Sequence, residues 1–280
     1  MNEIATLAIV GVGLIGGSVG LAAKRTGRFS RILGVGRDVA SLERARRYGC
    51  VDETSLQLTF ATDADVVVVC TPVDQIAAQV LELAPSCKPG TLLMDAGSTK
   101  AEIVRVVASS LPGHVDFVGA HPLAGSEKRG PEHGRAELFD GRITVLTPTE
   151  KTAVNATERA AAFWRSLGSE IRILFPDEHD RALAVTSHLP HVIAAALAGS
   201  LPDALHELTA TGFRDTTRIA AGDPALWTAI FEQNKTGVLA ALAKFDQRLA
   251  ELRAAVTRGD TTTLSRLLNE AKRTRDALGS

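Results

Sequence analysis

A histidine followed by proline is the residue in this chain best placed to do acid–base chemistry. His121 lies in residues 118–128, which read VGAHPLAGSEK, after an apolar run at residues 114–119 that is typical of a strand. Pro122 fixes its own φ and favours an extended His121, while Gly125 allows a tight reversal of the backbone. An imidazole titrates near neutral pH, and an open α/β enzyme keeps its acid or base just beyond a strand end. We therefore expect His121 in a loop as a general base; a histidine that only caps a backbone group is the alternative.

A glycine pattern near the N-terminus predicts a dinucleotide site. Residues 5–10 form a strand-like apolar run, the sequence Gly11-Val12-Gly13-Leu14-Ile15-Gly16 follows, and residues 17–24 have helical character. In this context Gly11 makes the tight turn, Gly13 lets the backbone approach a pyrophosphate, and Gly16 lets helix and strand pack closely. The amide groups of the turn, those of Leu14 and Ile15 included, then face the phosphates. A flexible glycine loop without a ligand is the alternative.

The end of the second predicted strand bears on which nucleotide is bound. This strand, at residues 31–36, ends in Gly36 and is followed by Arg37 and Asp38. An NAD site usually has an acidic residue here for the ribose 2′-hydroxyl, whereas an arginine can pair with the 2′-phosphate of NADP. Gly36 leaves room and Arg37 supplies charge, so we expect NADP. NAD is the alternative, with Asp38 reaching the ribose.

The following segments alternate between strand and helix, which predicts a parallel sheet. Strands are expected at residues 65–70 and 91–94, and helices at residues 39–48, 73–83 and 100–109. Thr71 and Pro72 end one strand, and Ser98 follows the next. Parallel strands bring these residues and His121 to the edge that carries the glycine turn, where the nicotinamide should lie. Ser98 or Thr99 could instead be only the N-cap of the helix that follows.

The chain divides at Pro176 into two parts of different character. A strand at residues 142–146, a helix at 149–167 and an edge strand at 171–174 complete the first part, and no convincing strand follows. We expect an α/β fold, with a Rossmann-like doubly wound sheet at residues 1–175 followed by an all-α domain for substrate binding and dimerisation at residues 176–280.

The second part is predicted to consist of helices rich in alanine. They are expected at residues 178–201, 205–221, 239–258 and 262–278, with another that begins at Asp223-Pro224. Pro190 should kink or break the first of them near residues 186–187. Such helices bury little apolar surface each, so we expect them to pack against a second copy of the chain.

Basic residues of this second part could line a substrate pocket. Arg214 and Arg218 are four residues apart, which places them on one face of a helix, and His188 and His191 flank Pro190. Each arginine alone is more typical of a solvated helix surface. Together, facing the nicotinamide edge, these residues favour a substrate that carries more than one carboxylate.

Composition excludes several other classes of function. The 280 residues contain 31 basic and 32 acidic side chains without a basic block, so neither nucleic acid nor an anionic membrane is an expected partner. Cys50, Cys70 and Cys87 are scattered, which predicts neither a disulfide framework nor a metal site and fits the cytoplasm. The apolar run at residues 7–23 follows only one charge, Glu3, and is rich in glycine, unlike a signal peptide or membrane anchor.

Six motifs together resemble the prephenate/arogenate dehydrogenase family of tyrosine biosynthesis. They occur in the family's order, from about residue 7 to about residue 235. The motifs are Gly-x-Gly-x-x-Gly-Gly-Ser from Gly11, Asp95-x-Gly-Ser-x-Lys, His121-Pro-x-Ala-Gly-x-Glu, Ser187-His-Leu-Pro-His191, Phe213-x-Asp-x-Thr-Arg218 and Asp223-Pro-x-x-Trp227. The resemblance implies a Rossmann domain followed by an interlocking helical dimerisation domain, with the active site between them.

The resemblance also implies NAD(P)-dependent oxidative decarboxylation of prephenate to 4-hydroxyphenylpyruvate. His121 matches the histidine that accepts the proton of the ring hydroxyl, Ser98 the serine that orients histidine, nicotinamide and substrate, and Arg218 the arginine that binds a substrate carboxylate. Further matches to pocket positions are His191, Ser126, Glu127, Asp215 and Trp227. Arogenate, which gives tyrosine directly, stays open as substrate, because no residue decides between a keto group and an amine.

Two readings from other classes remain as alternatives. A 3-hydroxy acid dehydrogenase shares the plan of a Rossmann domain with helices but commonly relies on a lysine of the helical domain; His121 and Arg218 argue against it. A dinucleotide sensor without catalysis would keep the glycine turn and lose the base, whereas His121 and Ser98 are both present.

Overall fold

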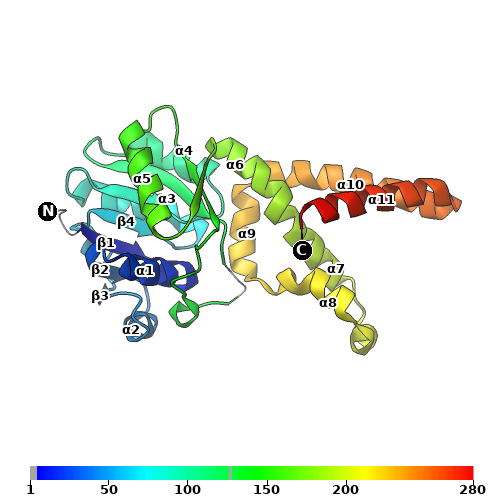
Figure 1. Cartoon of the computed structure of the whole chain (residues 1–280), viewed down its shortest axis with the longest axis horizontal. Coiled ribbons are helices and arrows are strands. Elements are labelled where there is room, and N and C mark those ends of the chain that lie inside the picture. Colours follow the sequence, from blue (N-terminus) through cyan, green and yellow to red (C-terminus); the bar gives the residue numbers. More distant parts are fainter. Residues whose placement is uncertain (1–4, 126–127, 280) are drawn as a thin grey trace. The chain divides into compact units, whose positions relative to one another are not determined.

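The structure, a computed structural model, describes residues 5–125 and 128–279. The chain separates into two compact units, Met1–Asn234 and Lys235–Ser280. The first unit contains the whole sheet and the helices as far as α9, and the second consists of the last two helices (Figure 1).

An eight-stranded sheet organises the first unit. Its spatial order is β3-β2-β1-β4-β5-β6-β7-β8, with the change of direction between β1 and β4 that creates a ligand crevice in doubly wound folds. The strands are β1 Ala5–Val10, β2 Phe29–Val35, β3 Glu53–Ser55, β4 Val66–Val69, β5 Leu92–Asp95, β6 Asp116–Pro122, β7 Ile143–Thr147 and β8 Glu170–Ile173. The short edge strand β3 was not expected from the sequence.

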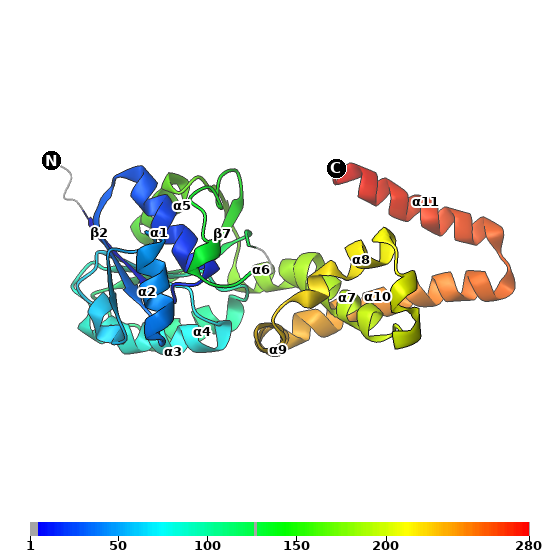
Figure 2. The same ribbon diagram turned by 90° about the horizontal axis from the view of Figure 1, so that it is seen from below.

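Helices cover both faces of the sheet, as the nearly uninterrupted apolar strands require. Helices α1 Leu14–Thr26, α2 Val39–Arg47 and α5 Val154–Ser166 pack on one face. Helices α3 Val73–Leu83, α4 Ala101–Ser110 and α9 Pro224–Gln233 pack on the other. Figure 2 shows α1 and α5 on the side of the sheet opposite α3 and α4. The doubly wound α/β architecture is therefore confirmed, with α9 of the helical part joined to its core.

The sheet is mixed rather than parallel throughout. The pairs from β3 to β6 are parallel, but β7 runs antiparallel to β6, with His121 opposite Val145 and Pro122 opposite Thr144. This pairing extends β6 to Pro122, so the expectation of a strand that ends at Gly119 with His121 in a loop was wrong. His121 is the penultimate residue of a paired strand and gains the rigidity of the sheet.

The predicted break around Pro190 is confirmed. Helix α6 spans Pro176–Leu183, a π-helical turn follows at Ala184–His188, and α7 spans Leu189–Gly199 with Pro190 in its first turn. A proline has no N–H and its ring collides with the preceding turn, so the backbone widens there. The wider turn sets the direction of Ser187, His188 and His191.

The expected single helix at residues 205–221 is three short pieces instead. A 3-10 segment at Asp203–Leu208, α8 at Thr211–Thr217 and a 3-10 segment at Arg218–Ala221 replace it. Arg214 lies in α8, and Arg218 begins the 3-10 segment that follows α8 directly. Helix α9 then begins as expected at Asp223, whose carboxylate accepts a hydrogen bond from the Ala225 N–H at 2.9 Å.

The second unit is a helical hairpin. Helix α10 spans Lys235–Arg258 and α11 spans Thr261–Ala277. The Asp260 carboxylate accepts a hydrogen bond from the Thr263 N–H at 2.9 Å and so caps α11. Arg248 links the two helices through an ion pair with Glu270.

Candidate active site

His121 reaches a large cavity from the carboxyl end of β6. The cavity has a volume of about 900 Å³ and is also lined by Arg218, His191 and Trp227. The structure thus brings together four of the residues expected to act on the substrate, from strand β6, the 3-10 segment before α9, and the helices α7 and α9. A base and a guanidinium in one cavity can serve a substrate that must both lose a proton and be held by a carboxylate.

The imidazole of His121 is partly buried and contacts a second histidine. Its Nδ1 lies 2.8 Å from Nε2 of His179, and Nδ1 of His179 lies 2.8 Å from Oδ1 of Asp180. Burial lowers the pKa of His121 well below its ordinary value, and electrostatic coupling to His179, Lys100 and His188 lowers it further. His121 is therefore uncharged at neutral pH, the state that a general base requires.

A buried ion pair fixes the strand that carries His121. Lys100 Nζ is fully buried, pairs with the Asp95 carboxylate and donates to the Ala120 carbonyl at 3.0 Å. Oδ1 of Asp95 accepts from the Ala120 N–H at 3.1 Å. Both backbone groups of the residue before His121 are thus held, which explains why the motif from Asp95 to Lys100 accompanies the histidine.

The N-terminus of α4 is capped by Asp180 and not by Ser98 or Thr99, so that part of the sequence prediction was wrong. The Asp180 carboxylate accepts hydrogen bonds from the N–H groups of Lys100 and Ala101, at 2.8 and 2.9 Å. The hydroxyl of Thr99 instead donates to Gln233 Oε1 at 2.5 Å. A carboxylate from α6 is a stronger partner for these donors than a local hydroxyl because of its charge.

Ser98 lies just after β5, one strand along the sheet from His121. Within residues 5–125 and 128–234, no hydrogen bond joins its side chain to His121, whose Nδ1 is engaged by His179. Its predicted roles toward His121, nicotinamide and substrate stay predictions.

The remaining predicted substrate residues divide between the cavity and its surroundings. The His191 ring lies stacked on Trp227, and burial with the charge of Arg218 lowers the pKa of His191 to about 4. Asp215 is exposed on α8 and does not line the cavity, and neither does Arg214. Ser126 and Glu127 lie outside the described residues.

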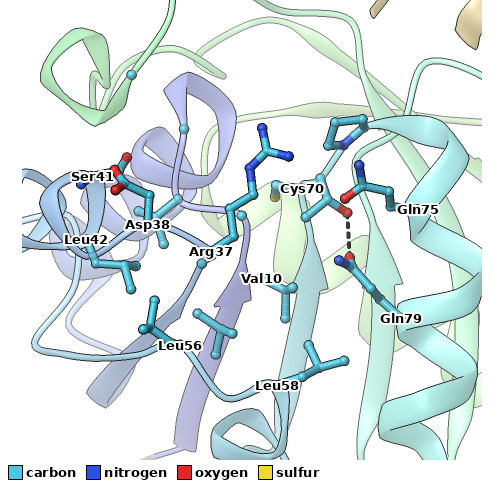
Figure 3. A pocket seen from close by; sticks show the side chains of 18 of the residues that line it. Val10, Arg37, Asp38, Ser41, Leu42, Leu56, Leu58, Cys70, Gln75 and Gln79 are labelled. Atoms are coloured by element: carbon cyan, nitrogen blue, oxygen red, sulfur yellow. Dashed lines mark hydrogen bonds between the residues drawn. The ribbon is translucent and has the colours of Figure 1, made fainter.

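A second cavity, of about 680 Å³, surrounds the glycine turn. Gly11, Gly13, Thr71 and Pro72 line it, as expected for a nucleotide site. Figure 3 shows other lining residues, Val10, Cys70 and Gln75 among them. Gly11 has φ of +89° and a Cβ there would lie 2.9 Å from the Cys70 backbone, whereas a Cβ on Gly13 would meet no atom within 4 Å and would fill the cavity. The turn therefore leaves open the space that a pyrophosphate occupies.

The other glycine-turn residues build the helix start rather than the cavity wall. Leu14 and Ile15 form the first turn of α1. A Cβ on Gly16 would lie 2.2 Å from the Gly11 carbonyl oxygen, so only glycine permits this close packing of helix on strand.

The residues after β2 line the far end of this second cavity. Figure 3 shows the Arg37 guanidinium extending into it, with Asp38 and Ser41 to one side. Oδ2 of Asp38 accepts a hydrogen bond from the Ser41 N–H at 2.8 Å and caps α2. Arg44 also lines this end and approaches Glu132 at 3.5 Å.

Arg129 lines both cavities and so marks where they meet. Its guanidinium pairs with the Asp223 carboxylate at 2.8 Å, which ties the segment after β6 to the start of α9. A nicotinamide bound at the carboxyl edge of the sheet would lie between the glycine turn and His121.

His179 and Asp180 were not among the residues predicted from the sequence. His179 lies 58 residues from its partner His121, and Asp180 lies 80 residues from its partner Lys100. No local spacing in the sequence predicts contacts over such separations. The one available signal was a pair of polar side chains that faces the core from the first turns of an amphipathic helix, where apolar residues are expected.

Comparison with known proteins gives consistent matches over the chain. A family model of the prephenate dehydrogenase nucleotide-binding domain matches residues 19–173, and one of the prephenate dehydrogenase dimerization domain matches residues 175–270. Cyclohexadienyl dehydrogenase of Zymomonas mobilis is 34% identical, over 99% of this chain and 97% of its own length.

Solved structures agree with these matches. Prephenate dehydrogenase from A. aeolicus, in complex with hydroxyphenyl propionate and NAD+, is 30% identical with a TM-score of 0.92 over 99% of both chains. Synechocystis arogenate dehydrogenase is 30% identical with a TM-score of 0.81, over 98% of this chain and 99% of its own.

Proposed function

Because the chain belongs to the prephenate dehydrogenase family, we propose that it oxidatively decarboxylates prephenate to 4-hydroxyphenylpyruvate with NAD(P), a step of tyrosine biosynthesis. The observation that carries this proposal is the presence of an uncharged His121 and of Arg218 in one cavity, beside a second cavity built on the glycine turn. We assign nucleotide binding to residues 1–175 and substrate binding with dimerisation to residues 176–280.

In the proposed mechanism, Arg218 holds a carboxylate of prephenate through a two-pronged hydrogen bond. A nicotinamide held at the glycine turn would supply the hydride acceptor for the carbon that bears the ring hydroxyl. His121, uncharged because of its lowered pKa, takes the proton of that hydroxyl. Carbon dioxide is then lost, the electron pair of the broken C–C bond makes the ring aromatic, and the resulting phenolate oxygen takes a proton back from His121 or water. Ser98 orients His121 and the reactants in this proposal, and His191 on Trp227 forms a wall of the substrate cavity.

For the cofactor, we propose that NADP is preferred. Arg37 and Arg44 both line the nucleotide cavity, and Arg37 follows β2, where a ribose 2′-phosphate would lie. The Asp38 carboxylate that would favour NAD is engaged as the cap of α2. NAD is the alternative, since Oδ1 of Asp38 can still accept from a ribose hydroxyl, and the A. aeolicus relative was solved with NAD+.

For the substrate, arogenate is the second candidate. The relatives include enzymes named for prephenate, for arogenate and for cyclohexadienyl substrates, and all share this fold. A dual-specificity enzyme would accept either the keto group or the amine at the far end of the substrate.

We further propose a cytoplasmic homodimer that binds no nucleic acid or membrane. The family model for the dimerization domain covers residues 175–270. Of α7, which is rich in alanine and leucine, only Ala194 is buried within the chain, and the exposed Ala195 and Ala196 leave part of its apolar surface available to a second copy. The three free cysteines fit a reducing compartment.

Steady-state rates with prephenate and arogenate, each with NAD and NADP, test the proposal. We expect turnover of prephenate, faster with NADP, and its loss in His121→Asn. Turnover of arogenate alone would establish the second candidate. No turnover in any combination, with retained nucleotide binding, would favour a hydroxy acid dehydrogenase or a sensor. Light scattering tests the proposed homodimer independently of these rates.

A further inference from the structure

We propose that His179 and Asp180 are positioning residues that hold His121 in the tautomer with its proton on Nδ1, so that Nε2 is the nitrogen that accepts the substrate proton. This inference rests on the proposed function, in which His121 is the base. It assigns a role to two side chains that the motifs did not single out.

The three side chains form a linear series of contacts that leads away from the cavity. Nδ1 of His121 lies 2.8 Å from Nε2 of His179, and Nδ1 of His179 lies 2.8 Å from Oδ1 of Asp180. His179 is 0% and Asp180 5% exposed, so the series is closed to water at its inner end. Only His121 lines the substrate cavity.

The protonation states of Asp180 and His179 determine which ring nitrogen of each histidine carries a proton. Burial alone would raise the pKa of Asp180, but hydrogen bonds from His179 and from two backbone N–H groups outweigh burial and keep it a carboxylate. A carboxylate only accepts, so Nδ1 of His179 must donate to it. Burial keeps the His179 ring neutral, which leaves its Nε2 without a proton and able only to accept. The donor to that nitrogen is therefore Nδ1–H of His121.

The Asp180 carboxylate cannot easily turn to reverse this order. Its Oδ1 and Oδ2 accept from the N–H groups of Lys100 and Ala101 at the start of α4, at 2.8 and 2.9 Å. Its own backbone carbonyl accepts from Asn234 Nδ2 at 2.7 Å. Both ends of the residue are thus fixed, and the acceptor that sets the tautomers is rigid.

The same series stabilises the product of proton transfer. When Nε2 of His121 takes the substrate proton, the ring becomes a cation whose Nδ1–H still donates to His179, with the Asp180 charge beyond it. Lys100 and His188 oppose this cation, and Asp95 offsets Lys100 by direct pairing. No proton has to leave Nδ1, so the base regenerates when Nε2 gives its proton to the phenolate oxygen of the product, directly or through water.

The wild-type protein provides the first test. Nitrogen-15 spectra of histidine-labelled full-length enzyme, with the His121 signals identified by their absence in His121→Asn, report which ring nitrogen carries the proton. We expect Nδ1–H for His121 at pH 7.5. An Nε2–H tautomer in an enzyme that turns over prephenate would overturn the inference.

Asp180→Asn is the sharper test, because an amide can reverse the series. With its NH₂ turned toward Nδ1 of His179, the side chain would donate to it; His179 would then donate from Nε2, and His121 would be left with its proton on Nε2. In the other orientation the amide oxygen still accepts and the order of protons is kept, so nitrogen-15 spectra of the variant decide which case holds. We expect kcat to fall by about 10²-fold or more with little change in KM, together with a reversed His121 tautomer. Unchanged kcat in a protein with the reversed tautomer would contradict the proposal, and so would a large fall in kcat with an unchanged His121 tautomer.

Two controls separate positioning from loss of structure. Asp65→Asn is matched, because Asp65 also accepts a backbone N–H, that of Thr6 at 2.7 Å, and contacts no histidine of the site; its kcat should stay normal. His179→Phe keeps a ring but removes the acceptor, and in the double variant with His121→Asn it should lower kcat no further than His121→Asn alone. An additive loss would assign His179 a role independent of His121. If wild type turns over neither substrate, the proposed function fails first.

Discussion

The imidazole of His191 lies against the indole of Trp227, with ring centroids 3.4 Å apart and planes inclined by 25°. Burial and the charge of Arg218 lower the pKa of His191 to about 4, so this ring is uncharged at neutral pH. A carboxylate at this end of the cavity would therefore meet the guanidinium charge of Arg218 and an uncharged, flat wall. This arrangement makes Arg218 the residue whose removal should weaken substrate binding most.

Arg218→Ala is expected to raise the KM for prephenate by about 10- to 100-fold, since a hydrogen-bonded charge contributes roughly 1.5–3 kcal/mol. Arg214→Ala is the matched control: it removes the same group four residues earlier, from an exposed position outside the cavity. Steady-state kinetics on both variants decide the point. Equal KM values for the two variants would place Arg218 outside the substrate site.

His121→Asn is expected to lower kcat by about 10²-fold or more while the dissociation constant of the nucleotide stays unchanged. His114→Asn is the control, because His114 contacts the Cys87 carbonyl at 3.1 Å and lines neither cavity. Since the pKa of His121 is lowered, the wild-type rate should hold steady as pH falls to 6.5 and decline only at lower pH, where the base becomes protonated. A decline that begins above pH 6.5 would show that another group controls the rate.

Arg37→Ala is expected to raise the KM for NADP by about tenfold or more and to change the KM for NAD little, because only NADP carries a 2′-phosphate. Arg46→Ala is the control, an exposed arginine on α2 that does not line the nucleotide cavity. The ratio of kcat/KM for the two cofactors is the measurement. An equal effect on both cofactors would remove Arg37 from the 2′-phosphate site.

Features set by local sequence were predictable. The glycine turn needs close approaches that only Gly11 and Gly16 allow, and the spacing of the glycines shows this directly. Pro190 disrupts the helix in the turn that precedes it, and Asp223 caps α9, the helix that follows it. In each case the residues that cause the structure are neighbours in the sequence.

Features set by distant partners were not predictable. Nothing in the residues of β7 specifies that it runs antiparallel to β6, because the direction depends on the path of the connection between them. Asp180 caps α4, in place of the residues next to the helix, only because the fold brings its carboxylate to the helix N-terminus. The contact of His121 with His179 has the same origin, and it determines the chemistry of the base.

The buried His188 is expected to make the protein less stable as the pH falls. This side chain is 0% exposed, its Nδ1 lies 3.1 Å from the Asn234 amide nitrogen, and burial lowers its pKa to about 4. Asp180 raises this pKa and His179 and His191 lower it, but burial dominates. Between pH 6.5 and about 4 the unfolded chain binds a proton at His188 that the native chain does not. Stability should therefore fall as pH falls, by up to about 1.4 kcal/mol per pH unit.

His188→Asn isolates this contribution, because its Oδ1 can still accept from Asn234 while the side chain cannot be protonated. The variant is expected to be less stable at pH 7.5, since a smaller side chain leaves a gap, but to lose less free energy of unfolding between pH 6.5 and 4.5. Urea unfolding at several pH values measures the difference between the two proteins. Parallel pH dependences for wild type and variant would mean that His188 is already protonated in the native state, against the burial seen here.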